Sequence, residues 1–405
     1  MSTGPEADEE GQGGEDRPQD DREAVKATGD APGGEEVRRA PHEVPRPLLG
    51  LLHQDQIDQK SRHAEVEEDD QGVEEVHTPT TLAPPGPGVH WHDGGMDLAS
   101  LHAAYRRIAP HTHRTPLLTS RLLDELLGKR LLLKAEHLQK TGSFKARGAL
   151  AKALTVESPK GLLAVSSGNH AQGVAYAARV LGVRALLVIP EEASPLKKAA
   201  ARAYGAEVVD RGVTAENREE VAKALKEETG YALIHPFDDP WVIAGQGTAG
   251  LELMVQAGER GVFPEAVLVP VGGGGLIAGV ATAVKALSPT TLVLGVEPEG
   301  ADDARRSLLA GRILRLPQAP RTRADGVRTL AVGELPFQVM REKVDGVLTV
   351  SEEAILEAER LLFTRTKQVV EPTGALPLAA VLEHGENLPK TLALLLSGGN
   401  RDFFP

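Results

Sequence analysis

The sequence predicts an α/β protein built on parallel β-sheets, and three observations lead to that class. The 405 residues are 41% hydrophobic but only 3% aromatic, which suits interiors packed with alanine, valine and leucine. Short apolar runs alternate with longer amphipathic segments, a βαβ rhythm typical of parallel sheets covered by helices. The length is sufficient for two domains with a large core.

The rhythm is clearest between residues 164 and 209. A short strand ends at Val165, and two helices follow further along, one stopped by Gly182 and one begun by Ser194 and Pro195. In chain order we predict helix Ala171–Leu181, strand Arg184–Ile189, a helix from Pro195 to Gly205, and strand Glu207–Val209.

Further buried strands are predicted at Ala266–Val271, Leu292–Val296 and Leu392–Leu396, with a helix at Leu276–Leu287. Ligand sites in such sheets lie outside the carboxyl ends of the strands. Small or polar residues follow three of the strands at that position, which makes them candidates for a binding site.

The first 95 residues differ from the rest of the chain. They hold 23 acidic and 8 basic residues and no periodic apolar pattern, so we expect a disordered extension. It has no secretory signal pattern, and Met96 is our hypothetical natural start. The remaining residues are nearly neutral, which predicts no nucleic-acid partner, and no apolar run is long enough to predict a membrane span.

Lys145 is the candidate nucleophile. The chain has no cysteine, and most lysines are solvated surface charges. Lys145, however, ends the small polar frame Gln-Lys-Thr-Gly-Ser-Phe-Lys at 139–145 and directly follows the aromatic Phe144. This setting suits an amine that attacks a carbonyl, so we predict that Lys145 forms a Schiff base.

The candidate anion site is a run of four glycines between a predicted strand and a predicted helix. The backbone N–H groups of Gly272, Gly273, Gly274 and Gly275 could turn toward one phosphate, which the helix N-terminus would also attract. Glycine runs also occur in linkers, but a linker would not stand between a buried strand and an apolar helix.

Two further clusters complete the pattern. Ser166 to His170 would suit an amino-acid carboxylate, with Asn169 facing an anionic ring oxygen; an ordinary helix cap is the alternative. Ser397 ends a strand with a hydroxyl that could face a heterocyclic nitrogen. Such a neutral partner would favour β-elimination over reactions that need a protonated ring. A lysine, a phosphate cradle, an amide and a hydroxyl together describe a holder of pyridoxal phosphate (PLP).

The order of motifs resembles the fold-type II PLP enzymes, which are tryptophan synthase β-like, and looks most like their threonine dehydratase and serine racemase branch. The resemblance covers roughly residues 97 to 402. It rests on Lys-Thr-Gly-Ser-Phe-Lys, Ser-Ser-Gly-Asn-His, Gly-Gln-Gly-Thr (245–248), Gly-Gly-Gly-Gly-Leu, Glu-Pro-Thr-Gly (371–374) and Ser-Gly-Gly-Asn. It implies two open parallel-sheet domains with the cofactor between them, which we place at 96–160 with 239–405 and at 161–238.

The resemblance also implies a role for each residue. Lys145 would bind PLP and take the Cα proton, Phe144 would cover the ring, and Ser167 would stand on the opposite face, as the second acid/base does in racemases. The other cofactor contacts would come from Asn169, Gly272, Gly273, Gly274, Gly275, Leu276 and Ser397. The substrate would contact Ser166, Ser167, Gly168, Asn169 and His170.

A metal site is implied as well. Residues 297–303 resemble the family loop that binds Mg²⁺ or Ca²⁺, with Glu297, the Ala301 carbonyl and Asp303 as ligands. Oxygen ligands suit such hard cations. A solvated acidic loop is the simpler alternative.

The expected function is a cytoplasmic L-threonine or L-serine dehydratase of amino-acid metabolism, including isoleucine biosynthesis, that acts as a homodimer or homotetramer. Its partner would be a small amino-acid substrate. A serine racemase with dehydratase side activity is the nearest alternative, and sulfhydrylases and threonine synthases share the fold. A catalytically silent amino-acid-binding protein is the alternative from another class.

Overall fold

The computed structural model describes residues 91–92, 95–166, 168–193, 195–214 and 216–401, all within the segment 42–405. The predicted disordered extension lies outside these residues, apart from its last few positions. Ser167, predicted as a second acid/base, and Ser194, predicted as a helix cap, also lie outside them.

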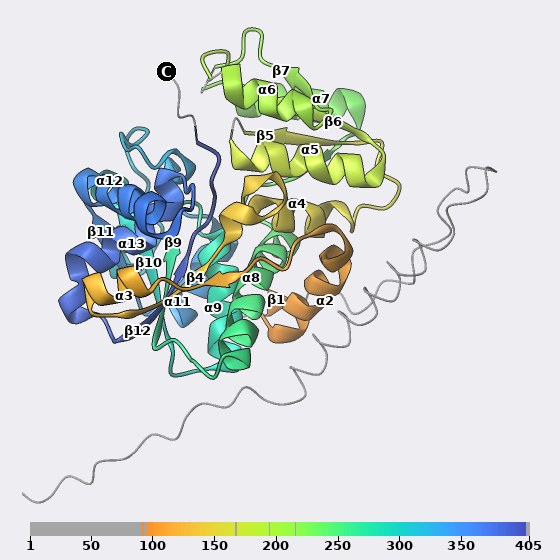
Figure 1. Ribbon diagram of the computed structural model, residues 1–405. Coiled ribbons are helices and arrows are strands. Elements are labelled where there is room, and N and C mark those ends of the chain that lie inside the picture. The colour runs from red at the N-terminus through yellow and green to blue at the C-terminus, as the bar shows by residue number, and fades with distance from the viewer. Residues whose placement is uncertain (1–90, 93–94, 167, 194, 215, 402–405) are drawn as a thin grey trace, which may run out of the picture. The chain divides into compact units, whose positions relative to one another are not determined.

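Helices and strands alternate along the described chain (Figure 1). The strands are β1 (Trp91–His92), β2 (Gly95–Met96), β3 (Leu117–Leu118), β4 (Arg130–Lys134), β5 (Gly161–Val165), β6 (Arg184–Val188), β7 (Glu207–Val209), β8 (Ala232–Leu233), β9 (Ala266–Pro270), β10 (Leu292–Pro298), β11 (Gly346–Val350) and β12 (Thr391–Leu395). The α-helices are α2 (Leu98–Ile108), α3 (Arg121–Leu127), α4 (Lys145–Ala153), α5 (Asn169–Leu181), α6 (Pro195–Ala203), α7 (Arg218–Thr229), α8 (Pro240–Glu259), α9 (Gly275–Leu287), α10 (Asp303–Ala310), α11 (Glu334–Lys343), α12 (Glu352–Leu361) and α13 (Pro372–His384). Shorter helical turns are η1 (Ala109–His111), η2 (Glu136–Leu138), η3 (Lys140–Gly142), η4 (Glu299–Ala301), η5 (Asp325–Val327), η6 (Leu362–Thr366) and η7 (Gly385–Asn387).

Four of the described strands form a parallel sheet in the order β7-β6-β5-β8. Side chains of β5 alternate between two cores: Leu162 and Ala164 pack in the core that includes α5, and Leu163 packs in the core that includes Ala222 of α7. Helices on both faces explain why the strands read as continuous apolar runs rather than as alternating ones.

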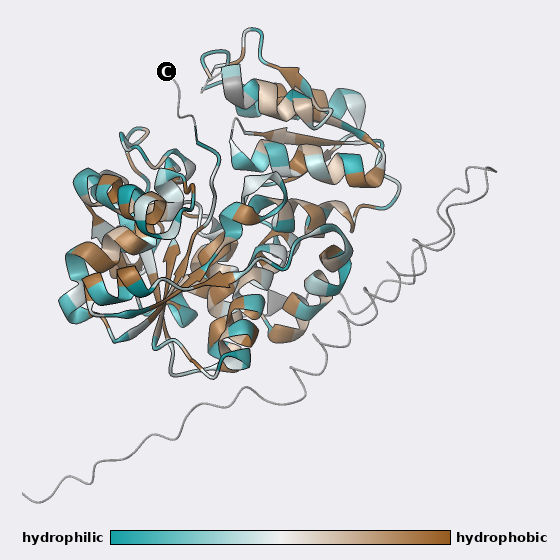
Figure 2. Cartoon of the chain, viewed as in Figure 1, coloured by the Kyte–Doolittle hydropathy of each residue, from teal (hydrophilic) through white to brown (hydrophobic). Residues whose placement is uncertain are grey.

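Six described strands form the larger sheet in the order β11-β10-β9-β12-β4-β3, parallel except for the pair β3 and β4. Its strands are mostly apolar (Figure 2). Leu394 of β12 lies beside Leu268 of β9, so the residues that follow both strands emerge at the same edge of the sheet. This register places Gly272 and Ser397 near each other.

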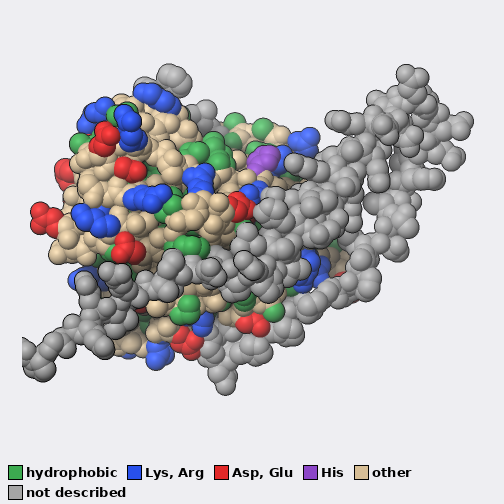
Figure 3. Space-filling view, turned by 60° about the horizontal axis from the view of Figure 1, so that its bottom comes forward, with side chains coloured by type: hydrophobic (Ala, Val, Ile, Leu, Met, Phe, Trp, Pro, Cys, Tyr) green, Lys and Arg blue, Asp and Glu red, His purple; other side chains and the backbone are tan. Residues whose placement is uncertain are grey.

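The larger sheet is also covered on both faces. Leu132 and Val267 pack in the core that includes α8 and α9, whereas Leu131 and Leu268 pack in the core that includes α12 and α13. None of the described helices combines the length and the apolar character needed to cross a bilayer. Basic and acidic side chains are interspersed on the face seen in Figure 3, as the near-neutral charge of residues 96–405 suggests.

An ionic cluster is buried beneath the start of α4. Arg147 contacts Glu136 (Nε to Oε2, 2.7 Å) and Glu252 (Nη1 to Oε1, 2.7 Å), and Lys134 contacts Glu252 (Nζ to Oε2, 2.6 Å); all four side chains are at most 2% exposed. Burial acts to lower the pKa of the Arg147 guanidinium, but the two carboxylates outweigh it and the net shift is upward. The cluster therefore connects α4, α8 and β4. Its two positive and two negative side chains neutralise one another only when all four are present.

The predicted elements are confirmed with small shifts at their ends. The helix after the serine pair begins at Asn169 rather than Ala171, and Gly182 ends it with φ 67°. Strand β10 continues to Pro298 because β11, which the sequence did not single out, pairs with it as far as Val350. The four-stranded sheet uses residues 161–233 and the larger sheet uses residues on either side, but the domain limits themselves stay a prediction.

Candidate active site

The predicted lysine, the glycine run and Ser397 line one cavity at the carboxyl edge of the larger sheet. The full lining is Phe144, Lys145, Phe237, Pro270, Gly272, Gly273, Gly274, Gly275, Leu276, Gly326, Val327, Thr373 and Ser397. Residues far apart in the sequence therefore meet at one place, as strand ends in an open sheet allow.

Lys145 is the first residue of α4, and its amine is held inside the site. Nζ donates a hydrogen bond to the carbonyl oxygen of Pro236 at 2.8 Å and lies 5.1 Å from the centroid of the Phe144 ring. Although the residue as a whole is only half-buried, its amine is desolvated, and burial lowers the pKa of Lys145 to about 8. A useful fraction of the amine is therefore unprotonated near neutral pH.

The loop before Lys145 has an unusual backbone. Thr141 and Gly142 both have positive φ, 62° and 71°, although a β-branched residue avoids that region. Asn400 stabilises the loop by donating from Nδ2 to the carbonyl of Thr141 at 2.7 Å. A Cβ on Gly142 would lie 2.5 Å from Asn400 Oδ1, so a side chain there would displace the Asn400 amide. Strain of this kind is characteristic of functional sites.

The glycine run joins β9 to the N-terminus of α9. Gly274 has φ +86°, and a Cβ on Gly273 would lie 2.2 Å from the ring of Phe237. A side chain at either position is therefore excluded, and the backbone can approach a ligand directly. The first N–H groups of a helix have no partner within it and carry partial positive charge, which suits a phosphate.

Three hydroxyl groups near the lysine are buried and have no hydrogen-bond partner among the described residues. They are Oγ1 of Thr141, Oγ of Ser143 and Oγ of Ser397. Burying a hydroxyl without a partner costs free energy, so these groups indicate a polar ligand that would complete them. Together with the glycine run and the amine, they fit PLP, which carries a phosphate, an aldehyde and a ring nitrogen.

The predicted substrate loop lies beside the cavity rather than in its described lining. The Ser166 hydroxyl accepts from the N–H of Gly168 at 3.2 Å, and Asn169 donates to Oε1 of Glu371 at 2.7 Å. His170 Nε2 bonds the Ile234 carbonyl at 2.8 Å, and burial, followed by the charge of Lys145, lowers the His170 pKa to about 3. The imidazole is therefore neutral.

Two of the predicted metal ligands, Glu297 and Asp303, are buried carboxyl groups. The Glu297 carboxylate is buried and accepts from the N–H groups of Ala304 and Arg305, each at 3.0 Å. Burial and the neighbouring Asp303 raise the pKa of Glu297 well above its usual value, and burial raises that of Asp303 to about 7. No group of three or more His, Cys, Asp or Glu suited to a metal occurs among the described residues. The set with the Ala301 carbonyl stays a prediction.

Several residues of the site were not predicted from the sequence. Thr373 and Glu371 belong to the Glu-Pro-Thr-Gly motif, whose sequence alone predicts no role for either side chain. Pro236 and Phe237 gave no signal, because a backbone carbonyl and an isolated aromatic ring have no distinctive pattern. They follow the short strand β8, and this position at a carboxyl strand end is the one clue that could have identified them.

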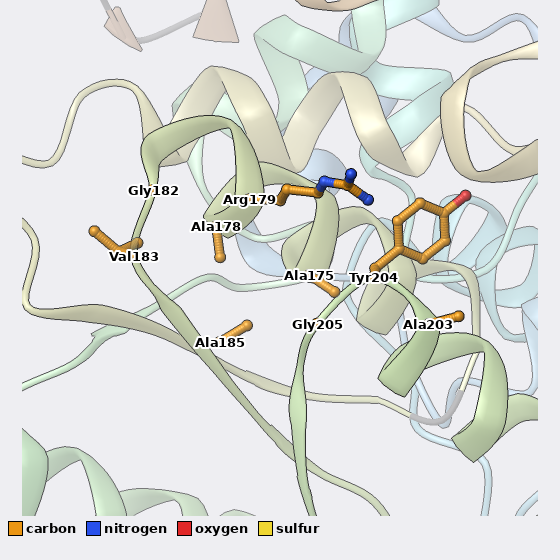
Figure 4. Close-up of a pocket in the computed structure, with 9 residues that line it drawn as sticks. All are labelled: Ala175, Ala178, Arg179, Gly182, Val183, Ala185, Ala203, Tyr204 and Gly205. Carbon is orange, nitrogen blue, oxygen red and sulfur yellow. The ribbon is translucent and has the colours of Figure 1, made fainter. Parts of the chain in front are cut away.

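A second hollow lies between α5 and α6 (Figure 4). It is lined by Ala175, Ala178, Arg179, Gly182, Val183, Ala185, Ala203, Tyr204 and Gly205. Val183 and Ala185 stand at the amino end of β6, so this hollow is at the opposite end of its sheet from the strand ends that carry chemistry. It contains none of the predicted site residues.

The two parallel sheets, with a lysine, a glycine cradle and a hydroxyl at the strand ends, define the class of PLP-binding enzymes. A family model described as "Pyridoxal-phosphate dependent enzyme" matches residues 108–398, which is well over half of the chain. The protein belongs to this family of fold-type II PLP enzymes.

Relatives within the family carry different activities. The L-threo-3-hydroxyaspartate ammonia-lyase of Saccharomyces cerevisiae is 43% identical over 303 residues, covering 74% of this chain and 91% of that protein. The serine racemase of Dictyostelium discoideum is 44% identical over 314 residues, covering 76% and 95%. The crystal structure of a T.th. threonine deaminase has 83% sequence identity and a TM-score of 0.75, covering 76% of this chain and 100% of that one.

Proposed function

We propose that this PLP enzyme is an ammonia-lyase that converts L-threonine to 2-oxobutanoate and ammonia, and L-serine to pyruvate and ammonia. The observation that carries the proposal is the desolvated amine of Lys145, which faces the same cavity as the glycine run and Ser397. The 83% identity with the T.th. threonine deaminase supports the choice of substrate.

Lys145 is the proposed acid/base on one face of the site. Bound PLP withdraws electrons from an attached amino acid and so makes its Cα proton removable. With a pKa of about 8, the amine can bind the cofactor and later accept that proton near neutral pH. The Pro236 carbonyl, 2.8 Å away, orients Nζ before the reaction.

The other residues would hold the cofactor at its remaining corners. The N–H groups of Gly272, Gly273, Gly274 and Gly275 would bind the phosphate, with Leu276 continuing into α9. Phe144 would cover the ring, and Ser397 would meet the ring nitrogen with a neutral hydroxyl. A neutral hydroxyl does not stabilise a protonated ring nitrogen as a carboxylate would. Loss of a β-hydroxyl is therefore favoured over reactions that need a long-lived carbanion.

The substrate carboxylate would bind the loop Ser166 to His170, where backbone N–H groups precede α5. Ser167 belongs to the predicted set but lies outside the described residues. Serine racemisation is the second candidate function. It is supported by the serine racemases among the relatives, at 40 to 44% identity.

A side-by-side assay separates these activities. The PLP-loaded protein is incubated with L-threonine, L-serine, L-threo-3-hydroxyaspartate, and O-acetylserine with sulfide, and 2-oxo acids, ammonia, D-serine and cysteine are measured. We expect the highest kcat/KM with L-threonine. Faster formation of D-serine than of pyruvate would assign the enzyme as a racemase, and absence of any 2-oxo acid would remove the ammonia-lyase.

We also propose that Glu297, the Ala301 carbonyl and Asp303 bind Mg²⁺ or Ca²⁺. The two carboxylates lie close enough for Asp303 to raise the pKa of Glu297, and Oδ2 of Asp303 is buried without a partner among the described residues. Isothermal titration with MgCl₂ or CaCl₂ is expected to give binding heat that Glu297→Gln abolishes and Asp302→Asn, at a more exposed neighbour, retains. Absence of cation-dependent heat in the unchanged protein would refute the site.

The cytoplasmic location, the homodimer or homotetramer, and a place in isoleucine biosynthesis stay predictions. A sedimentation experiment with the PLP-loaded protein tests the assembly.

A further inference from the structure

We propose that Glu371 and Asn400 are positioning residues that lock the side-chain amide of Asn169, so that one of its N–H groups faces the ring oxygen of PLP. The inference rests on the proposed role of Asn169 and assigns a role to the Glu-Pro-Thr-Gly and Ser-Gly-Gly-Asn motifs. It begins from a chain of three hydrogen-bonded side chains that come from distant parts of the sequence.

The hydrogen bonds determine how the Asn169 amide is oriented. Nδ2 of Asn169 donates to Oε1 of Glu371 at 2.7 Å, and Oδ1 of Asn169 accepts from Nδ2 of Asn400 at 2.8 Å. Asn400 Nδ2 also donates to the carbonyl of Thr141 at 2.7 Å. A backbone carbonyl can only accept, so the atom of Asn400 that faces Thr141 must be its nitrogen. The same nitrogen faces Asn169, so the Asn169 atom next to it must be the accepting oxygen.

The consequence concerns the second hydrogen on Asn169 Nδ2. An amide nitrogen has two donors, and Glu371 takes one of them among the described partners. A flip of the amide would place its oxygen against the carboxyl oxygen of Glu371 and its nitrogen against that of Asn400. The two partners therefore fix the identity of the two amide atoms and leave one N–H of Asn169 available for an anionic oxygen.

The backbone is shaped to allow this arrangement. Glu371 is 3% exposed, and its N–H donates to the Gly398 carbonyl at 3.0 Å. A Cβ on Gly398 would lie 2.4 Å from Oε1 of Glu371 and 3.0 Å from Nδ2 of Asn169, so a side chain there would break the contact. Gly398 directly follows Ser397, the predicted partner of the ring nitrogen.

The network also joins the two sheets. Asn169 begins α5, which packs on the four-stranded sheet, whereas Glu371 precedes α13 and Asn400 follows β12 of the larger sheet. Through Thr141, the same network holds the strained loop before Lys145. The amide that would meet the cofactor is thereby fixed relative to both the lysine and the strand end at Ser397.

The test is a double-mutant cycle read by PLP binding and by the visible spectrum of the PLP-loaded protein across pH. Glu371→Ala is expected to weaken PLP binding about tenfold, the effect of one buried hydrogen bond, and to shift the pH at which the spectrum changes. Glu371→Gln keeps an acceptor oxygen and is expected to restore most of the affinity. In the Asn169→Ala background, Glu371→Ala is expected to add nothing.

Two outcomes overturn the inference. One is a Glu371→Ala protein with the affinity and spectrum of the unchanged enzyme; the other is an effect of Glu371→Ala that adds fully to that of Asn169→Ala. If Glu371→Ala loses its circular dichroism signal, Glu371→Asp, which draws the carboxyl group away from Asn169, replaces it in the same cycle with the same expectations. Glu386→Ala, at an exposed carboxyl just beyond α13, is the control expected to leave both readouts unchanged.

Failure of the proposed function gives a different result. In that case the unchanged protein itself would bind no PLP or would release no 2-oxo acid. The double-mutant cycle compares each variant with an unchanged protein that binds PLP. Failure of the proposed function and failure of this inference therefore give different results.

Discussion

Replacing Lys145 with alanine is expected to abolish the visible absorbance that PLP gives the unchanged protein and to lower 2-oxo acid formation by about a thousandfold or more. The physical reason is that this amine would both attach the cofactor and accept the Cα proton. Its position inside the cavity, its bond to the Pro236 carbonyl and its pKa of about 8 support both roles. The measurement is an absorbance scan with a coupled assay for 2-oxobutanoate.

Lys152→Ala is the matched control, because this lysine lies on the same helix two turns further on. Its amine pairs with Asp239 at 2.7 Å, outside the cavity lining, so absorbance and turnover are expected to be retained. Ammonia release by Lys145→Ala at the rate of the unchanged enzyme would refute the assignment of the lysine.

Replacing Arg147 with methionine is expected to lower the free energy of unfolding of the apoprotein by about 3 to 5 kcal/mol. The guanidinium is fully buried and contacts Glu136 and Glu252, each at 2.7 Å. Its removal leaves two buried carboxylates with only Lys134 as a cationic partner. Urea unfolding followed by circular dichroism measures the loss, and methionine preserves most of the side-chain volume.

Arg114→Met is the control for the chemistry of an arginine–glutamate pair. Arg114 contacts Glu259 at 2.6 Å, but both side chains are more than a quarter exposed, so solvent screens the interaction. A loss of about 0 to 1 kcal/mol is expected there. Equal losses for the two variants would contradict the special role of the buried cluster.

The sequence was sufficient to predict the helices and strands that are determined by residues close together in the chain. Gly182 ends α5 in the left-handed conformation that glycine adopts easily, and buried strands such as β9 appear as unbroken apolar runs. The glycine run was recognised because Gly272 to Gly275 stand between such a strand and an apolar helix, which is also a local pattern.

The interactions that the sequence could not predict are those between distant residues. Lys145 and Pro236 are 91 positions apart, and Asn169 and Glu371 are 202 apart. Residue type alone would also predict the wrong location for two charged side chains. Lys134 and Arg147 would be expected on the surface, yet both are fully buried because Glu136 and Glu252 neutralise them. Such pairings depend on the tertiary structure rather than on neighbours in the chain.

The attachment point of PLP tests the central claim most directly. The PLP-loaded protein is reduced with borohydride, digested, and mapped by peptide mass spectrometry. If the amine of Lys145 meets the cofactor beside the glycine run and Ser397, the reduced label is found on Lys145 alone. A label on a different lysine, or none on any lysine of a protein that has bound PLP, would contradict the account.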